Sequence, residues 1–167
     1  MRLTPIALSA AIMLATVAGA GNGQKPDDQI DARSVAMTQQ AQALSAQGRY
    51  QEATDLLETA LVVDPRNRQA FIALGRVAQA EKLPGKAVKF YLEALKLEPN
   101  DVTALAAQGE ALVQRGAVER AKQNLERVRS LCKGTCPQAA SLAAAIAKGP
   151  PAEVLTAQRP DVAAPKP

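Results

Sequence analysis

Histidine and tryptophan are absent from this 167-residue chain, which holds two tyrosines, two phenylalanines and two cysteines. Without histidine there is no Ser/His/Asp or Cys/His nucleophilic site, because such sites need an imidazole as their general base. The same absence excludes zinc sites that use histidine and the C-x-x-C-H attachment of haem. We therefore expect no enzyme activity, no metal site and no cofactor.

The first twenty residues have the composition of a secretory signal peptide. Arg2 gives a positively charged start, residues 6–17 form a short apolar run, and residues 18–20 (AGA) provide a cleavage site of small residues. The apolar run is short for the ~20 residues that a membrane span needs. We therefore expect cleavage after residue 20. The mature chain is then exported, with a bacterial periplasm as its location and no stable membrane insertion.

Positive charge is weak and spread along the chain, with a formal net charge of +4. A nucleic-acid-binding domain needs a concentrated basic patch, so no nucleic-acid partner is expected. Lysines and arginines do recur between Lys82 and Lys133, but glutamates are interleaved with them. Pairing at i,i+4 on a solvated helix face explains this pattern. A docking surface for anionic envelope components is the alternative.

The central stretch, residues 68–101, predicts two short amphipathic helices. Apolar Phe71, Leu74 and Val77 recur at a helical period in its first half. Pro84 follows a break in the pattern and suits the first turn of a second helix, because its missing N–H would have no partner there. Neither helix can bury its apolar face alone, so neighbouring elements must cover both.

The same pattern recurs upstream and downstream with a period of 34 residues. Ala53, Ala87 and Ala121 are separated by this period, and so are Pro65 and Pro99. A helix–turn–helix unit with this period resembles the tetratricopeptide repeat (TPR). The resemblance covers about residues 34–148 and implies an all-α fold, a right-handed superhelical solenoid of about three repeats with a C-terminal capping helix.

The period and the composition together predict the domain organisation. We expect a signal peptide at 1–20, a flexible leader at 21–30, a repeat domain at 31–148 and a disordered tail rich in proline and alanine at 149–167. Within the domain we expect repeats at about 34–67, 68–101 and 102–135, and a capping helix at 137–148. Asp28 or Asp31 is expected to cap the first helix.

Small residues at the repeat positions predict close helix crossings. Ala53, Ala87 and Ala121 are expected where the second helix of each pair crosses the first, and Gly75 and Gly109 are expected to do similar work on the first helix. A larger side chain there would push the helix axes beyond their usual separation of about 8–10 Å.

Cys132 and Cys136 predict a structural disulfide, because paired thiols in exported proteins are usually oxidised. Gly134 between them can supply the positive φ that ends one helix before the next begins. A redox-active pair is the alternative, although the spacing is C-x-x-x-C and not C-x-x-C. Two thiols are too few ligands for a metal site.

The family resemblance implies binding of a protein or peptide in the concave groove that the first helices line. The matching positions are Val35, Thr38, Gln39, Gln42, Gln69, Ile72, Arg76, Gln79, Thr103, Ala106, Glu110 and Val113. Ordinary solvated helix surface is the alternative for each of them. Some members hold the terminal carboxylate of chaperones with lysine, asparagine and arginine. Those positions are Thr38, Gln42, Ala73, Thr103 and Ala107 here, so that clamp is absent.

Together these observations predict a non-enzymatic protein- or peptide-binding scaffold or adaptor in the bacterial cell envelope. Its expected partner is another envelope protein or a peptide segment. The alternative from a different class is a thiol–disulfide redox protein that uses Cys132 and Cys136.

Overall fold

A computed structural model describes residues 29–157 with the exception of Lys133. The expected signal peptide therefore lies outside the described residues, as does most of the leader. In the described part the chain forms helices and no strands. The helices are α1 (Ala32–Ala46), α2 (Tyr50–Val63), α3 (Arg68–Ala80), α4 (Pro84–Leu97), α5 (Val102–Gln114), α6 (Val118–Leu131), α7 (Pro137–Lys148) and α8 (Ala152–Ala157). None of these described helices has the length and apolar character needed to cross a membrane.

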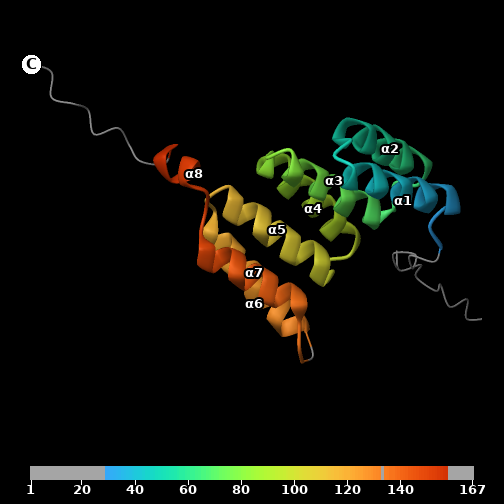
Figure 1. Cartoon of the computed structure of the whole chain (residues 1–167). Helices are drawn as coiled ribbons and strands as arrows, with labels where there is room; N and C mark the ends of the chain where they lie inside the picture. The colour runs from blue at the N-terminus through green and yellow to red at the C-terminus, as the bar shows by residue number, and fades with distance from the viewer. Residues whose placement is uncertain (1–28, 133, 158–167) are drawn as a thin grey trace, which may run out of the picture.

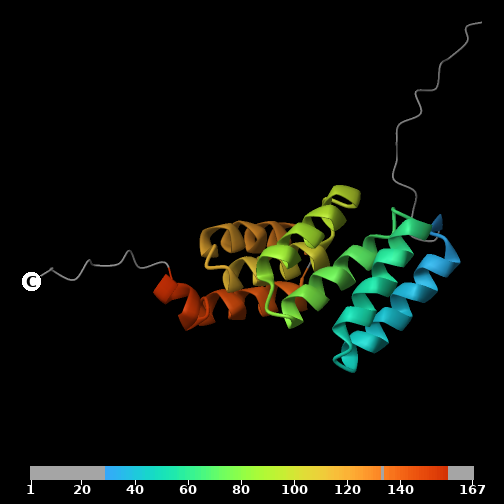
Figure 2. The same cartoon turned by 90° about the horizontal axis from the view of Figure 1, so that it is seen from above.

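The helices pack as successive antiparallel pairs, α1 with α2, α3 with α4 and α5 with α6 (Figures 1 and 2). Short turns force this antiparallel arrangement within each pair. The first helix of each pair also contacts the first helix of the next, and α7 packs against both α5 and α6. The predicted all-α stack of about three repeats with a C-terminal capping helix is therefore confirmed.

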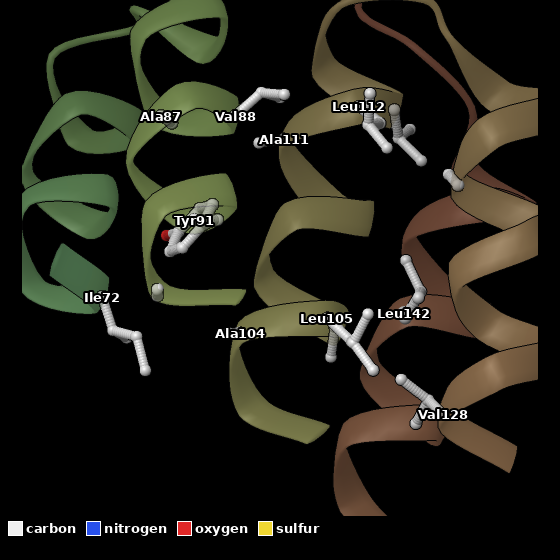
Figure 3. Close-up of a cluster of buried hydrophobic side chains, with 14 of the residues drawn as sticks. Ile72, Ala87, Val88, Tyr91, Ala104, Leu105, Ala111, Leu112, Val128 and Leu142 are labelled. Carbon is white, nitrogen blue, oxygen red and sulfur yellow. The ribbon is translucent and has the colours of Figure 1, made fainter. Parts of the chain in front are cut away.

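The core runs through the stack in two hydrophobic clusters. One joins α1, α2 and α3, and the other extends from α3 to α7. Phe90 of α4 packs against both clusters, so the apolar interior is continuous between the first and last pairs. Figure 3 shows Leu105 and Leu112 of α5 pointing towards Leu142 of α7 and Val128 of α6. The helix α7 thus covers the apolar side of the last pair.

The small residues at the repeat positions lie at tight contacts. Ala53, Ala87 and Ala121 are all fully buried. A Cβ at Gly75 would lie 2.4 Å from Tyr91 Cε1, within the same pair. The expectation that Gly109 acts in the same way needs correction, because a Cβ there would meet Leu142 of α7, 2.7 Å away. Gly109 therefore makes room for the capping helix.

The N-terminus of each first helix is capped by an acidic or amide side chain. Asp31 accepts from the Arg33 N–H at 2.8 Å, as one of the two expected caps of α1. Asn67 and Asp101 cap α3 and α5 in the same way. Each side-chain oxygen satisfies a helix N–H that has no partner within the helix.

Asn67 also joins the first pair to the second. Its Nδ2 donates to Ser34 Oγ at 2.8 Å and to Thr38 Oγ1 at 3.0 Å, and all three residues are buried. The two hydroxyls donate elsewhere, Ser34 to the Ala60 carbonyl and Thr38 to the Ser34 carbonyl. The hydroxyl oxygens therefore face Asn67 as acceptors, and only a donor satisfies them.

The junction between the second and third pairs is formed by an ion pair, whereas the junction between the first and second pairs is formed by the Asn67 amide. Asp101 Oδ2 lies 2.8 Å from Arg68 Nε, and both side chains are largely buried. Asp64, at the end of α2, forms a second ionic contact near the first junction. It accepts from the Arg66 guanidinium at 2.9 Å and from the Asp31 N–H at 3.0 Å. These contacts hold successive repeats in a fixed register.

The expected disordered tail needs correction at residues 152–157, which form α8. Gly149 ends α7 with a φ of 76°. The Pro151 carbonyl then accepts from the N–H groups of Val154 and Leu155, which begins a new turn. Residues 149–167 are rich in proline as a whole, so their overall composition did not predict a helix in the short segment that lacks proline. Residues 158–167 lie outside the described part of the chain.

In the part of the chain that the structure describes, acidic and basic side chains on the outer helices α4 and α6 pair at i,i+3, and not at the expected i,i+4. The pairs are Glu93–Lys96, Glu119–Lys122 and Glu126–Arg129, with N–O distances of 2.7–2.8 Å. Exposed pairs of this kind stabilise a helix by only ~0.3–0.5 kcal/mol.

Candidate functional site

The first helices α1, α3 and α5 and the capping helix α7 line a run of adjacent hollows that share lining residues, which we call the groove. A cavity of about 310 Å³ lies between α1, α2 and α3. A second cavity of about 180 Å³ lies between α3, α5 and α7, with Tyr91 of α4 in its lining. A third of about 610 Å³ lies between α5, α7 and residues 149–152. Arg76 lines the first two cavities, and Glu110 and Ser141 line the second and third.

Seven of the positions proposed from the sequence lie in this groove. They are Gln42, Arg76, Gln79, Thr103, Ala106, Glu110 and Val113. They come from α1, α3 and α5, so the structure brings residues of three repeats to one face, although Ala106 and Val113 are themselves largely buried in the core cluster. Three others, Val35, Gln39 and Gln69, are exposed but do not line these cavities.

Thr38 and Ile72 need correction, because neither lines these cavities. Thr38 is 3% exposed, and its hydroxyl is held between Ser34 and Asn67 in the first junction. Ile72 is 1% exposed and belongs to the core cluster shared by the second and third pairs. Both positions are on first helices, but the neighbouring repeat covers them.

Tyr91 of α4 was not expected among the groove residues, because it comes from a second helix. Its side chain passes under α3 at Gly75, and its hydroxyl donates to Gln79 Oε1 at the surface of the groove. Burial raises the pKa of the Tyr91 phenol; the nearby Arg76 charge acts in the opposite direction, and Glu110 raises it further. The phenol is therefore neutral at physiological pH.

The capping helix also contributes residues that the sequence did not single out. Ser141 Oγ donates to Glu110 Oε1 at 2.6 Å, and Gln138 lines the same cavity. The segment after α7 borders the end of the groove. Pro151 and Val154 lie across a cavity of about 350 Å³ from residues of the α3–α4 turn. One sequence feature could have predicted these contributions. The spacing of apolar residues in α7 indicates that this helix packs against α5.

The structure joins Cys132 and Cys136 in a disulfide at the corner between α6 and α7, with their Cα atoms 5.9 Å apart. Gly134 has a φ of 101°, the left-handed conformation proposed for this corner. Both cysteines are partly buried against the hydrophobic cluster of the last repeat. The pair lies at the junction of the capping helix and outside the groove.

Comparison with known proteins gives the same architecture. Residues 38–102 match the family described as tetratricopeptide repeat. A probable UDP-N-acetylglucosamine–peptide N-acetylglucosaminyltransferase SPINDLY of Hordeum vulgare is 30% identical over 90 residues. That match takes in 54% of this chain but 10% of the relative, so the chain spans about a tenth of its length.

Solved structures share the fold at lower sequence identity. The second TPR domain of human RPAP3, in complex with the HSP70 peptide SGPTIEEVD, has a TM-score of 0.63 and 21% identity, over 69% of this chain and 95% of that domain. The Yersinia enterocolitica type III secretion chaperone SycD, in complex with a peptide of the translocator YopD, has a TM-score of 0.61 and 19% identity, over 72% and 92%.

Proposed function

We propose that this chain, which matches the tetratricopeptide repeat over residues 38–102 and shares its fold, is a non-enzymatic scaffold that binds a peptide segment of another protein in the groove. The continuity of the groove carries this proposal. Arg76 is shared by the first and second cavities and Glu110 by the second and third. One extended segment therefore contacts several repeats at once, which is how solenoids gain affinity from a shallow surface.

The complexes of similar structures support this proposal. The RPAP3 domain holds a peptide of HSP70, and SycD holds a peptide of YopD. The shared feature is the stack of helix pairs, which leaves the first helices along one side. The groove of the present chain lies on the first helices of that stack and is lined by its own residues.

Site-specific photo-crosslinking tests the groove. A photoreactive amino acid at Gln42 or Thr103, in cavities at opposite sides of Arg76, is expected to capture the same partner. The matched control is Lys89, which is exposed on the outer helix α4. Capture from Lys89 but from neither groove position would show that the outer face is the working surface.

We further propose that the protein acts in the bacterial cell envelope, with a partner located there. The support is the sequence of residues 1–20, with its positive start, apolar run and small-residue cleavage site. Expression of the full chain in a bacterial host is expected to give a periplasmic protein whose mass corresponds to a start at Gly21. Retention of residues 1–20 in a cytoplasmic product would contradict the proposal.

A further inference from the structure

Among the described residues, α1, α3 and α5 place one cation, Arg76, and one anion, Glu110, in the groove, and Lys148 of the capping helix lines the third cavity. The surroundings of Arg76 and Glu110 differ. Glu110 accepts a hydrogen bond from Ser141, which uses part of its acceptor capacity within the protein. Arg76 is exposed and makes no hydrogen bond or ion pair with any residue in the described ranges 29–132 and 134–157. The guanidinium therefore presents its planar set of donors to the groove. A carboxylate matches that set in both charge and geometry.

A hollow of mixed lining, in which aliphatic side chains outnumber the polar Gln42, Ser45 and Tyr50, lies directly beside this cation. Arg76 forms part of the lining of the cavity between α1, α2 and α3, and the other walls include Ala41, Leu57, Ala73 and Val77. The volume of about 310 Å³ is at the low end for ligand pockets, which run from ~300 to ~1,000 Å³. Such a hollow suits an aliphatic side chain of a bound segment better than a complete small molecule.

We propose that the groove recognises an extended peptide segment in which an aspartate or glutamate side chain pairs with Arg76 while a neighbouring aliphatic side chain enters the hollow between α1, α2 and α3. This inference rests on the proposed function, because it names the chemistry of the segment that the groove binds. The carboxylate belongs to a side chain within the segment and not to a chain terminus. The positions of the terminal-carboxylate clamp hold no cation, since residues such as Thr38 and Thr103 occupy them.

Selection from a phage library of random twelve-residue peptides tests this inference. The full mature protein is immobilised, and enriched peptides are synthesised with an amidated C-terminus, so that only side chains supply a carboxylate. We expect the enriched sequences to share an acidic residue close to an aliphatic one. We expect Arg76→Ala to raise the Kd of such peptides at least tenfold, and Arg76→Glu to shift a new selection towards lysine and arginine. Lys89→Ala, on the outer helix, is the matched control and should leave Kd unchanged.

A second pair of variants tests the hollow. Ala46 lines it and is exposed at the end of α1, so Ala46→Leu fills part of the hollow while the core stays intact. Ala43→Leu adds the same side chain to an exposed position of α1 that does not line the cavity. We expect Ala46→Leu to weaken binding and to remove the aliphatic preference, and Ala43→Leu to do neither.

The outcomes separate failure of the inference from failure of the proposed function. Enriched peptides that lack acidic residues, or that bind Arg76→Ala as tightly as the unaltered protein, would overturn the inference. If those peptides still depended on groove position Thr103, the proposed function would stand. An absence of any enriched peptide, or binding lost only in Lys89→Ala, would overturn both.

Discussion

Gly75 offers a test of the packing in the second repeat with a single methyl group. A Cβ placed there would lie 2.4 Å from Tyr91 Cε1, 2.6 Å from Cζ and 2.8 Å from Cδ1. Carbon atoms in contact are usually separated by about 3.5–4.0 Å. Tyr91 is fully buried, and its hydroxyl is bonded to Gln79, so the ring cannot move aside without losing contacts. Gly75→Ala therefore forces α3 and α4 apart or displaces the ring.

Two effects of opposite sign determine the size of the change. Alanine is the better helix former by ~1 kcal/mol, which favours the variant. Overpacking of a filled core costs ~1–3 kcal/mol, and the three short distances place this case at the upper end. We expect Gly75→Ala to lose about 1–2 kcal/mol in the free energy of unfolding, measured by urea denaturation at neutral pH.

Gly85 is the matched control for this measurement. It lies in the first turn of α4, and a Cβ added there meets no atom within 4 Å. Gly85→Ala is expected to be neutral or to stabilise by up to ~1 kcal/mol, because it restricts the unfolded chain. Combining Gly75→Ala with Tyr91→Leu should recover part of the loss, since the two changes share one contact. Equal stability of Gly75→Ala and Gly85→Ala would refute the reasoning.

Four further changes test the disulfide and the repeat junctions. Cys132 and Cys136 are expected to give no free thiol under native conditions, and reduction should lower stability by only about 2 kcal/mol, because the closed loop is short. Labelling of both thiols without reduction would contradict this. Burial opposes ionisation of Asp64, but hydrogen bonds from two backbone N–H groups and a guanidinium outweigh it, so its pKa is lowered. The stability that Asp64 contributes is therefore present above the unfolded pKa of about 3.9 and is lost as the pH falls towards the folded value. Asp64→Asn should cost about 1–3 kcal/mol at pH 7, with a smaller difference in thermal midpoint at pH 3. Asn67→Asp should cost at least 2 kcal/mol at pH 7 and less at low pH, where the introduced carboxyl can donate a proton. The converse change, Asp101→Asn, should cost about 1 kcal/mol, and an equal cost for both would show that the surroundings of the caps do not matter.

The repeat architecture could be predicted from the sequence because local rules and the period agree. Pro84 begins α4, Asp31 caps α1, and Gly134 has the positive φ that a corner requires. Each of these roles depends on a few neighbouring residues. The fully buried alanines, such as Ala87, were predictable for a different reason: their period places them at successive helix crossings.

Whether each residue on the groove side is buried or exposed could not be predicted in the same way. A helical period shows which side of α3 a residue is on, but not how far the next repeat covers that side. Ile72 and Arg76 are one turn apart on this helix, yet Ile72 is buried and Arg76 is exposed. Tyr91 was missed because its route into the groove depends on the space beside Gly75, which is a property of the packed pair.

The two junctions explain why a repeat protein need not repeat its polar residues. Asn67 and Asp101 cap α3 and α5 in the same manner, so capping alone does not distinguish them. The other contacts of these two side chains distinguish them. Asn67 faces two hydroxyl oxygens that already donate elsewhere and so need a donor, whereas Asp101 faces the Arg68 guanidinium and so needs an acceptor. Each cap therefore fits one neighbour and would be poorly satisfied at the other junction. Because these junctions hold α3 against α1 and α5, they also determine where Arg76 lies between its two hollows.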